Sequence, residues 1–124
     1  MIYRRIYAAA TATAVVLSMV LGSAAFAAEA IRIGEMNSYT RLPAFTLPYR
    51  NGWQLALDEI NKAGGVMDRQ IEVISKDDGG NPGDAITVAN DLVAKEGVVL
   101  MFGTLLSNVG LAVSDFAKQK KVPF

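Results

Sequence analysis

The pattern of hydrophobic and polar positions changes its period several times along the chain. Residues 31–35 alternate apolar side chains with others, which is typical of a half-buried strand. We expect a helix to follow, with Thr46 as its cap, Pro48 in its first turn and Ala63-Gly64-Gly65 at its end. The apolar residues of this helix recur at steps of three and four and predict one buried face: Trp53, Ala56, Leu57 and Ile60.

Two more strand–helix pairs are predicted after it. Residues 70–75 alternate again and predict a half-exposed edge strand. Asn81-Pro82-Gly83-Asp84 predicts a helix start, with an Asn cap, a Pro at the first position and an acid in the first turn. Residues 98–102 are apolar on both faces, as in a central parallel strand covered by helices, and a third helix begins near Ser107. The buried stripes of these two helices are Ala85, Val88, Ala89, Leu92 and Val93, and then Val109, Ala112, Val113, Phe116 and Ala117.

This order of elements predicts an α/β fold. Strands that alternate with helices form a parallel sheet with right-handed crossovers and with helices on both faces. Residues 122–124 resemble the start of a fourth strand, so we expect the sequence to be incomplete at its C-terminus.

Residues 1–27 have the three parts of a secretory signal peptide. Arg4 and Arg5 give a positive start, an uncharged, mostly apolar run of 14 residues follows from Ala8 to Leu21, and Ala25-Phe26-Ala27 supplies small residues for a signal peptidase. A membrane-spanning helix needs roughly 20 apolar residues, so we favour cleavage over an anchor. We predict a signal-peptide helix that is cut between Ala27 and Ala28, and a periplasmic domain over residues 28–124.

Composition excludes several classes of function. The first 27 residues hold two of the twelve basic residues and none of the twelve acidic ones, so the remainder has a net charge of −2. That balance argues against a nucleic-acid partner. The chain has no cysteine and no histidine, which removes thiol nucleophiles, disulfides, zinc sites with nitrogen or sulfur ligands, and histidine catalysis. An enzyme built from Asp, Glu, Lys, Ser and Tyr stays open as a rival, but we expect no enzyme, no cofactor and no metal.

A ligand site is expected beyond the carboxyl ends of the strands, where the strand order reverses. If the order is 2-1-3, the loops after the first and third strands meet there. Ser107 starts a helix, so its hydroxyl and the free N–H groups after it can bind one anion, and a small carboxylate suits that arrangement. The other interpretation is that Ser107 only caps its own helix.

Two further groups of residues have competing interpretations. Tyr39 and Phe45 either form an aromatic wall for an apolar ligand or fold back on Trp53. Asp77 and Asp78 form a pair that suggests Mg²⁺ binding or acid–base chemistry. Because neighbouring residues on a strand point to opposite faces, we favour a solvated turn for the aspartates.

With these elements placed, the chain resembles the branched-chain amino acid (Leu/Ile/Val) type of periplasmic binding proteins, which have the type I fold. The residues that carry the resemblance are Ile31 to Gly34, Asn51 to Val66, Glu72 to Asp78, Gly103, Ser107 and Val122-Pro123. They span essentially all of residues 28–124. The stretch from Gly52 to Val66, followed at this distance by paired aspartates, is far more specific than a short motif.

The resemblance implies a two-lobed clamshell that holds its ligand in a cleft and delivers it to an ABC transporter permease. This chain would be the N-terminal part of one lobe. It implies that Ser107 holds the ligand carboxylate and that Leu105 and Leu106 offer backbone groups or line the pocket. Phe45 falls near a position that often carries an aromatic residue, and we count Tyr39 and Asn108 among the candidate ligand residues.

Two departures from the family pattern touch the pocket. The loop from Asn37 to Tyr49 is longer than the common form, and Asn108 replaces what is often a second serine. The expected ligand is therefore an amino acid or a similar small carboxylate. We expect a monomeric solute-binding component of an ABC transporter, and a sensor or receptor domain of the same fold stays open as the alternative.

Overall fold

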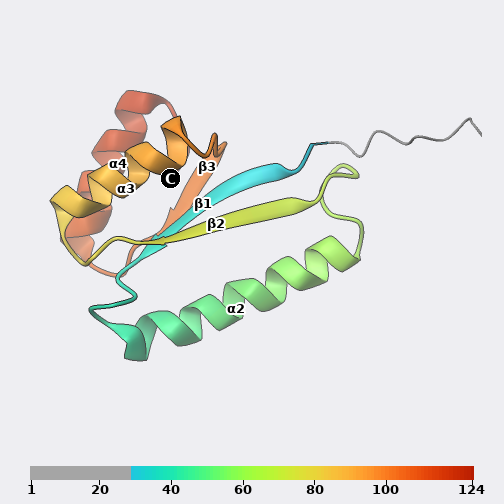
Figure 1. Ribbon diagram of the computed structural model, residues 1–124, viewed down its shortest axis with the longest axis horizontal. Helices are drawn as coiled ribbons and strands as arrows, with labels where there is room; N and C mark the ends of the chain where they lie inside the picture. The colour runs from blue at the N-terminus through green and yellow to red at the C-terminus, as the bar shows by residue number, and fades with distance from the viewer. Residues whose placement is uncertain (1–28) are drawn as a thin grey trace, which may run out of the picture.

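The computed structural model describes residues 29–124, and the predicted signal peptide and its cleavage site lie outside these residues. Three strands alternate with three helices in the described part (Figure 1). The elements are β1 (Ile31–Asn37), α2 (Pro43–Lys62), β2 (Ile71–Asp77), α3 (Pro82–Ala94), β3 (Leu100–Gly103) and α4 (Ser107–Lys120). The predicted alternation of strands and helices is confirmed.

The three strands form one parallel sheet in the order β2-β1-β3. This is the 2-1-3 order considered from the sequence, with β2 at an edge as predicted. Helix α2 covers one face of the sheet, and α3 and α4 cover the other (Figure 1). The expectation of helices on both faces is therefore confirmed for the described part.

The apolar core lies between the sheet and the pair α3 and α4. Gly34 allows this close packing, because a Cβ there would lie 3.0 Å from the Leu92 side chain. The core cluster is Met36, Ala85, Ala89, Leu92, Val98, Met101, Val109, Val113, Phe116 and Ala117. Most of the residues predicted as the buried stripes of α3 and α4 belong to this cluster or pack against it.

The predicted start of α2 was wrong. The helix begins at Pro43, not after Thr46, because proline suits a first helical position, where its missing N–H costs nothing. Thr46 lies inside the first turns, is buried, and donates its hydroxyl to the Leu42 carbonyl at 3.1 Å. Pro48 consequently lies within the helix. The predicted end at residues 63–65 agrees with the structure, since Gly64 has a φ of 108°.

The other boundaries differ less. Asn81 caps α3 as predicted, and its side-chain oxygen accepts hydrogen bonds from the backbone of Gly83 and Asp84. Strand β3 begins at Leu100, later than the predicted Val98, although the Val99 N–H already donates to Arg32 at 2.9 Å.

The predicted start of a fourth strand lies beside β3. The N–H of Met101 donates to the Pro123 carbonyl at 2.9 Å, on the side of β3 away from β1. Residues 122–124 do not themselves form a strand.

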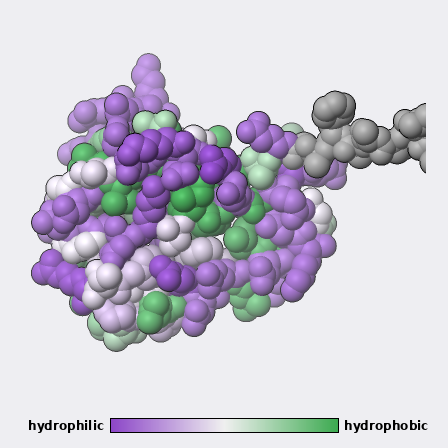
Figure 2. Space-filling model, in the orientation of Figure 1, coloured by the Kyte–Doolittle hydropathy of each residue, from purple (hydrophilic) through white to green (hydrophobic). Residues whose placement is uncertain are grey.

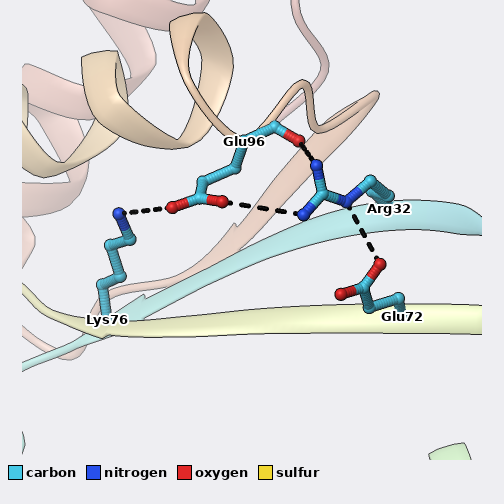
Figure 3. A network of polar contacts seen from close by, with 4 residues as sticks. All are labelled: Arg32, Glu72, Lys76 and Glu96. Carbon is cyan, nitrogen blue, oxygen red and sulfur yellow. Dashed lines mark hydrogen bonds and ion pairs between the residues drawn. The ribbon is translucent and has the colours of Figure 1, made fainter.

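A charged network ties the C-terminal end of α3 to the sheet (Figure 3). Glu96 pairs with Lys76 at 3.0 Å and with Arg32 at 3.6 Å, and Arg32 also reaches Glu72 on β2 at 3.1 Å. A guanidinium N–H of Arg32 donates to the Glu96 carbonyl as well. Because the four side chains are partly exposed, this network adds only modestly to stability.

Hydrophilic residues dominate the face of the molecule that Figure 2 shows. Apolar residues are visible there mainly at the level of the sheet, between α2 and the pair α3 and α4 (Figure 2). Among residues 29–124, none of the helices has the length and hydrophobicity that a membrane span requires.

Candidate functional site

The three strands end together at one edge of the sheet. Because they are parallel, the carboxyl ends of β1 at Asn37, β2 at Asp77 and β3 at Gly103 face the same side. The loops that follow lead into α2, α3 and α4. This edge contains every candidate ligand residue, in the loops after β1 and β3 or in the first turns of α2 and α4.

The loop after β3 has an unusual backbone. Gly103 has a φ of 118° and Thr104 a φ of 63°, and a positive φ is rare for a β-branched residue such as threonine. The N–H of Thr104 donates to the Met36 carbonyl at 2.8 Å, which fixes the loop to the end of β1. A Cβ at Gly103 would lie only 2.1 Å from the same oxygen. Strain of this kind is commonly found at functional sites.

Ser107 is the first residue of α4 and is exposed at this edge. Leu106 occupies the cap position, and no side chain in the described part caps the helix. The cap role that was considered for Ser107 is therefore not observed. The first N–H groups of α4 keep their capacity to bind an anion, and the helix dipole favours negative charge there.

The neighbours of Ser107 differ in their packing. Leu105 is 45% exposed, whereas Leu106 packs against the apolar core. Asn108 is exposed on the first turn of α4. Of the two leucines, only Leu105 leaves a large part of its side chain available to another molecule.

Tyr39 folds inward and does not form an exposed wall. It is 8% exposed, its hydroxyl donates to Glu35 at 2.9 Å, and the Arg50 guanidinium lies 3.6 Å from the centre of its ring. Its partners are thus Glu35 and Arg50, while Trp53 packs edge-on against Phe102.

Phe45 lies in the first turn of α2 and is 66% exposed. It is thus the more accessible of the two aromatic residues that were considered for the ligand wall.

Glu35 is a buried acid that was not predicted from the sequence as a site residue. It lies on β1, on the face toward α2, and accepts hydrogen bonds from Tyr39 and from the Ser75 hydroxyl at 2.6 Å. Burial raises the pKa of Glu35, and these two hydrogen bonds and the Arg50 charge only partly offset the effect. Ile31, Ile33 and Glu35 lie at every second position and therefore share one face of the strand. An acid in line with two apolar residues on that face was the signal available in the sequence.

The same environment affects Tyr49. Partial burial, followed by the nearby negative charge of Glu35, raises the pKa of Tyr49 to about 12. The phenol therefore stays neutral at physiological pH.

The aspartate pair at the end of β2 has a different role from the one favoured above. Asp78 is buried, so the interpretation as a solvated turn is wrong for this residue. The Asp77 carboxylate accepts hydrogen bonds from the backbone N–H groups of Tyr39 and Thr40. Partial burial opposes ionisation of Asp77, but its hydrogen bonds with Thr40, Gly79 and Tyr39 outweigh that effect and lower its pKa.

The parallel sheet in the order β2-β1-β3 and the helices that alternate with its strands define an α/β lobe. Residues 30–124 match the family described as periplasmic binding protein, and the chain belongs to that family.

Two curated relatives are named as proteins that bind amino acids. The chain is 36% identical over 73 residues to the Leu/Ile/Val-binding protein BraC3 of Rhizobium johnstonii, covering 59% of this chain and 20% of that protein. It is 30% identical over 103 residues to an amino acid binding protein of Pseudomonas aeruginosa, covering 82% of this chain and 28% of the relative. The chain therefore spans less than a third of the length of these relatives.

Solved structures agree in fold. The branched-chain amino acid transporter substrate binding protein LivJ from Streptococcus pneumoniae, in complex with isoleucine, matches with a TM-score of 0.71 and 35% identity. That match covers 76% of this chain and 27% of the LivJ chain. A putative branched-chain amino acid ABC transporter protein from Rhodospirillum rubrum matches with a TM-score of 0.72 and 26% identity, covering 76% of this chain and 28% of the other.

Proposed function

We propose that this chain forms the N-terminal part of one lobe of a solute-binding component of an ABC transporter, which captures an amino acid in the periplasm. Residues 28–124 would belong to this lobe, and residues 1–27 would be the signal peptide that directs export. The membership in the family of periplasmic binding proteins supports this role. The names of the relatives favour a branched-chain amino acid such as leucine, isoleucine or valine.

The observation that carries the proposal is the uncapped start of α4 at the carboxyl edge of the sheet. Ser107 is exposed there, and no side chain of the described residues competes for the first N–H groups of the helix. A ligand carboxylate would accept hydrogen bonds from these groups and from the Ser107 hydroxyl. Binding would be reversible and would involve no chemical step.

The other candidate residues would shape the pocket around the carboxylate. Leu105 and Phe45 have exposed apolar side chains among these candidates, and they would contact the ligand side chain. Leu106 and Asn108 would contribute through the backbone and the first turn of α4. Tyr39 would support the conformation of its loop and would not line the pocket with its ring, since its hydroxyl binds Glu35 and its ring packs against Arg50.

A titration tests this function. The polypeptide encoded by the complete reading frame would be screened by calorimetry against the twenty standard amino acids, and we expect tight binding of at least one apolar amino acid. Ser107→Ala should weaken that binding roughly tenfold, as expected for one hydrogen bond to a charged group. Ser114→Ala is the matched control, because Ser114 is exposed on the same helix further from its start.

Two results of this titration would contradict the proposal. If no amino acid binds, the proposed function is wrong. If Ser114→Ala weakens binding as much as Ser107→Ala, the start of α4 is not the carboxylate site. The isolated residues 29–124 should bind weakly, because a cleft between two lobes needs both walls.

Localisation and partner follow from the same proposal. We expect the protein in the periplasm as a monomer, with an N-terminus at Ala28, and in contact with a membrane permease. Mass spectrometry of the periplasmic fraction would test the cleavage point, and an N-terminus at Met1 would contradict it.

A further inference from the structure

The loop between β1 and α2 is held along its length by the turn that follows β2. The Asp77 carboxylate accepts from the N–H of Tyr39 at 3.1 Å and of Thr40 at 3.0 Å. The same carboxylate accepts from the Gly79 N–H in its own turn at 2.9 Å. Both Asp77 oxygens are therefore engaged by backbone groups.

Asp78 binds the beginning of the same loop. Its Oδ1 accepts from the Ser38 hydroxyl at 2.7 Å and from the Gly80 N–H at 2.8 Å, and its own N–H donates to the Asn37 carbonyl at 2.9 Å. Arg41 completes the connection by donating to the Gly80 carbonyl at 2.8 Å. Each residue from Ser38 to Arg41 is thus tied to the β2–α3 turn.

These contacts argue against Mg²⁺ binding or acid–base chemistry as the role of Asp77 and Asp78. Three acceptor atoms, Asp77 Oδ1, Asp77 Oδ2 and Asp78 Oδ1, already bind groups of the protein, and Asp78 Oδ2 is buried without a hydrogen-bond partner among the described residues. The loop N–H groups need acceptors, and a carboxylate forms stronger hydrogen bonds to them than a neutral group does. The pair therefore serves to hold backbone.

We propose that Asp77 and Asp78 are positioning residues of the ligand cleft, an inference that rests on the proposed function. They hold the β1–α2 loop in one conformation before the ligand arrives. The loop leads from Tyr39 to the start of α2, which carries Phe45, so its position determines where this wall of the cleft stands. A loop that is already ordered does not lose conformational freedom when the ligand binds, and affinity is higher for that reason.

Asp77→Asn tests the proposal with a small change at a partly exposed position. The asparagine keeps one oxygen, while its amide nitrogen cannot accept from a backbone N–H. Asp58→Asn is the matched control, since Asp58 is exposed on α2 and the same charge is removed. Ser38→Ala is a second variant that removes only the hydroxyl bound to Asp78.

Three quantities would be measured on the polypeptide of the complete reading frame. They are the dissociation constant for the tightest-binding of the twenty amino acids, the urea midpoint, and hydrogen exchange at the amides of Tyr39 and Thr40. We expect Asp77→Asn to raise the dissociation constant roughly tenfold and to speed exchange at these amides by a similar factor. The urea midpoint should also fall, because the ionised Asp77 and its hydrogen bonds stabilise the folded state, and Ser38→Ala should weaken binding in the same direction.

The results distinguish failure of this inference from failure of the function. If the wild type binds no amino acid, the proposed function fails, and the inference fails with it. If the wild type binds and both Asp77→Asn and Ser38→Ala bind within twofold of it, the function stands and the positioning role is wrong. The proposal is also overturned if Leu92→Ala, a destabilising core variant that leaves the loop contacts in place, weakens binding as much as Asp77→Asn, because the loss of affinity would then follow from a general loss of stability. If Asp77→Asn does not fold, the binding of Ser38→Ala decides.

Discussion

Gly103 permits a sharp test of how the loop after β3 is built. A Cβ at this position would lie 2.1 Å from the Met36 carbonyl oxygen, whereas ordinary contacts to a Cβ begin near 3.4 Å. Its φ of 118° is also a region that side chains rarely adopt. Gly103→Ala should therefore displace the loop and break the hydrogen bond from Thr104 to Met36.

A second glycine separates the steric cost from the backbone cost. Gly97 has a φ of 67°, but a Cβ there would have no atom within 4 Å, so Gly97→Ala suffers only the backbone penalty of about 1 kcal/mol. Gly103→Ala adds about 1 kcal/mol for the lost hydrogen bond and about 1–2 kcal/mol for the steric displacement. We expect a total of about 3–4 kcal/mol, a large part of the roughly 5–15 kcal/mol typical of a domain.

Urea unfolding followed by circular dichroism measures both variants against the wild type. The free energy of unfolding should fall by about 2–3 kcal/mol more for Gly103→Ala than for Gly97→Ala. A difference below about 0.5 kcal/mol, within the usual error of such measurements, would show that the close approach to Met36 does not constrain the loop.

Three other predictions concern the rest of the lobe. The raised pKa of Glu35 means that the folded state binds this proton more tightly than the unfolded chain, so stability is lost as pH rises from the ordinary value of 4.5 through the raised one. Glu35→Gln should then be more stable than the wild type at pH 7, by about 1.4 kcal/mol for each tenfold gain in proton affinity on folding. At pH 4 the two proteins should be nearly equal in stability. Equal urea midpoints at pH 7 would contradict this. Leu92→Ala, at a buried core position, should cost about 3 kcal/mol in the same assay, and a cost below about 1 kcal/mol would place Leu92 outside the core. Glu96→Gln should cost less than about 1 kcal/mol, and the cost should shrink in high salt; a cost that salt does not change would exclude an electrostatic origin.

The parts of the fold that depend on neighbouring residues were predictable. The cap at Asn81 needs only the residues immediately after it, and its bonds to Gly83 and Asp84 lie within one turn. The start of α2 was mispredicted because Thr46 is a good cap by residue type, while its burial depends on tertiary structure that residue type does not indicate. A proline at the first position was the better local signal.

The parts of the site that depend on distant residues were not predictable. Glu35 and Ser75 are 40 positions apart, as are Ser38 and Asp78, and no local pattern indicates that they meet. The positive φ of Thr104 has no signal in residue type, because threonine disfavours that conformation. The position of Ser107 at a helix start was predicted, since strand and helix patterns placed it there.

The two faces of the sheet have different roles: one contributes mainly to stability, and the other contributes to the position of the β1–α2 loop. The face toward α3 and α4 is apolar, and it contains the buried core. The face toward α2 contains a buried acid, Glu35, which accepts from Tyr39 in the loop. Substitutions such as Leu92→Ala should therefore lower stability with little effect on ligand affinity. Changes at Glu35 should alter how Tyr39 supports the proposed cleft, because the Tyr39 hydroxyl donates to that carboxylate.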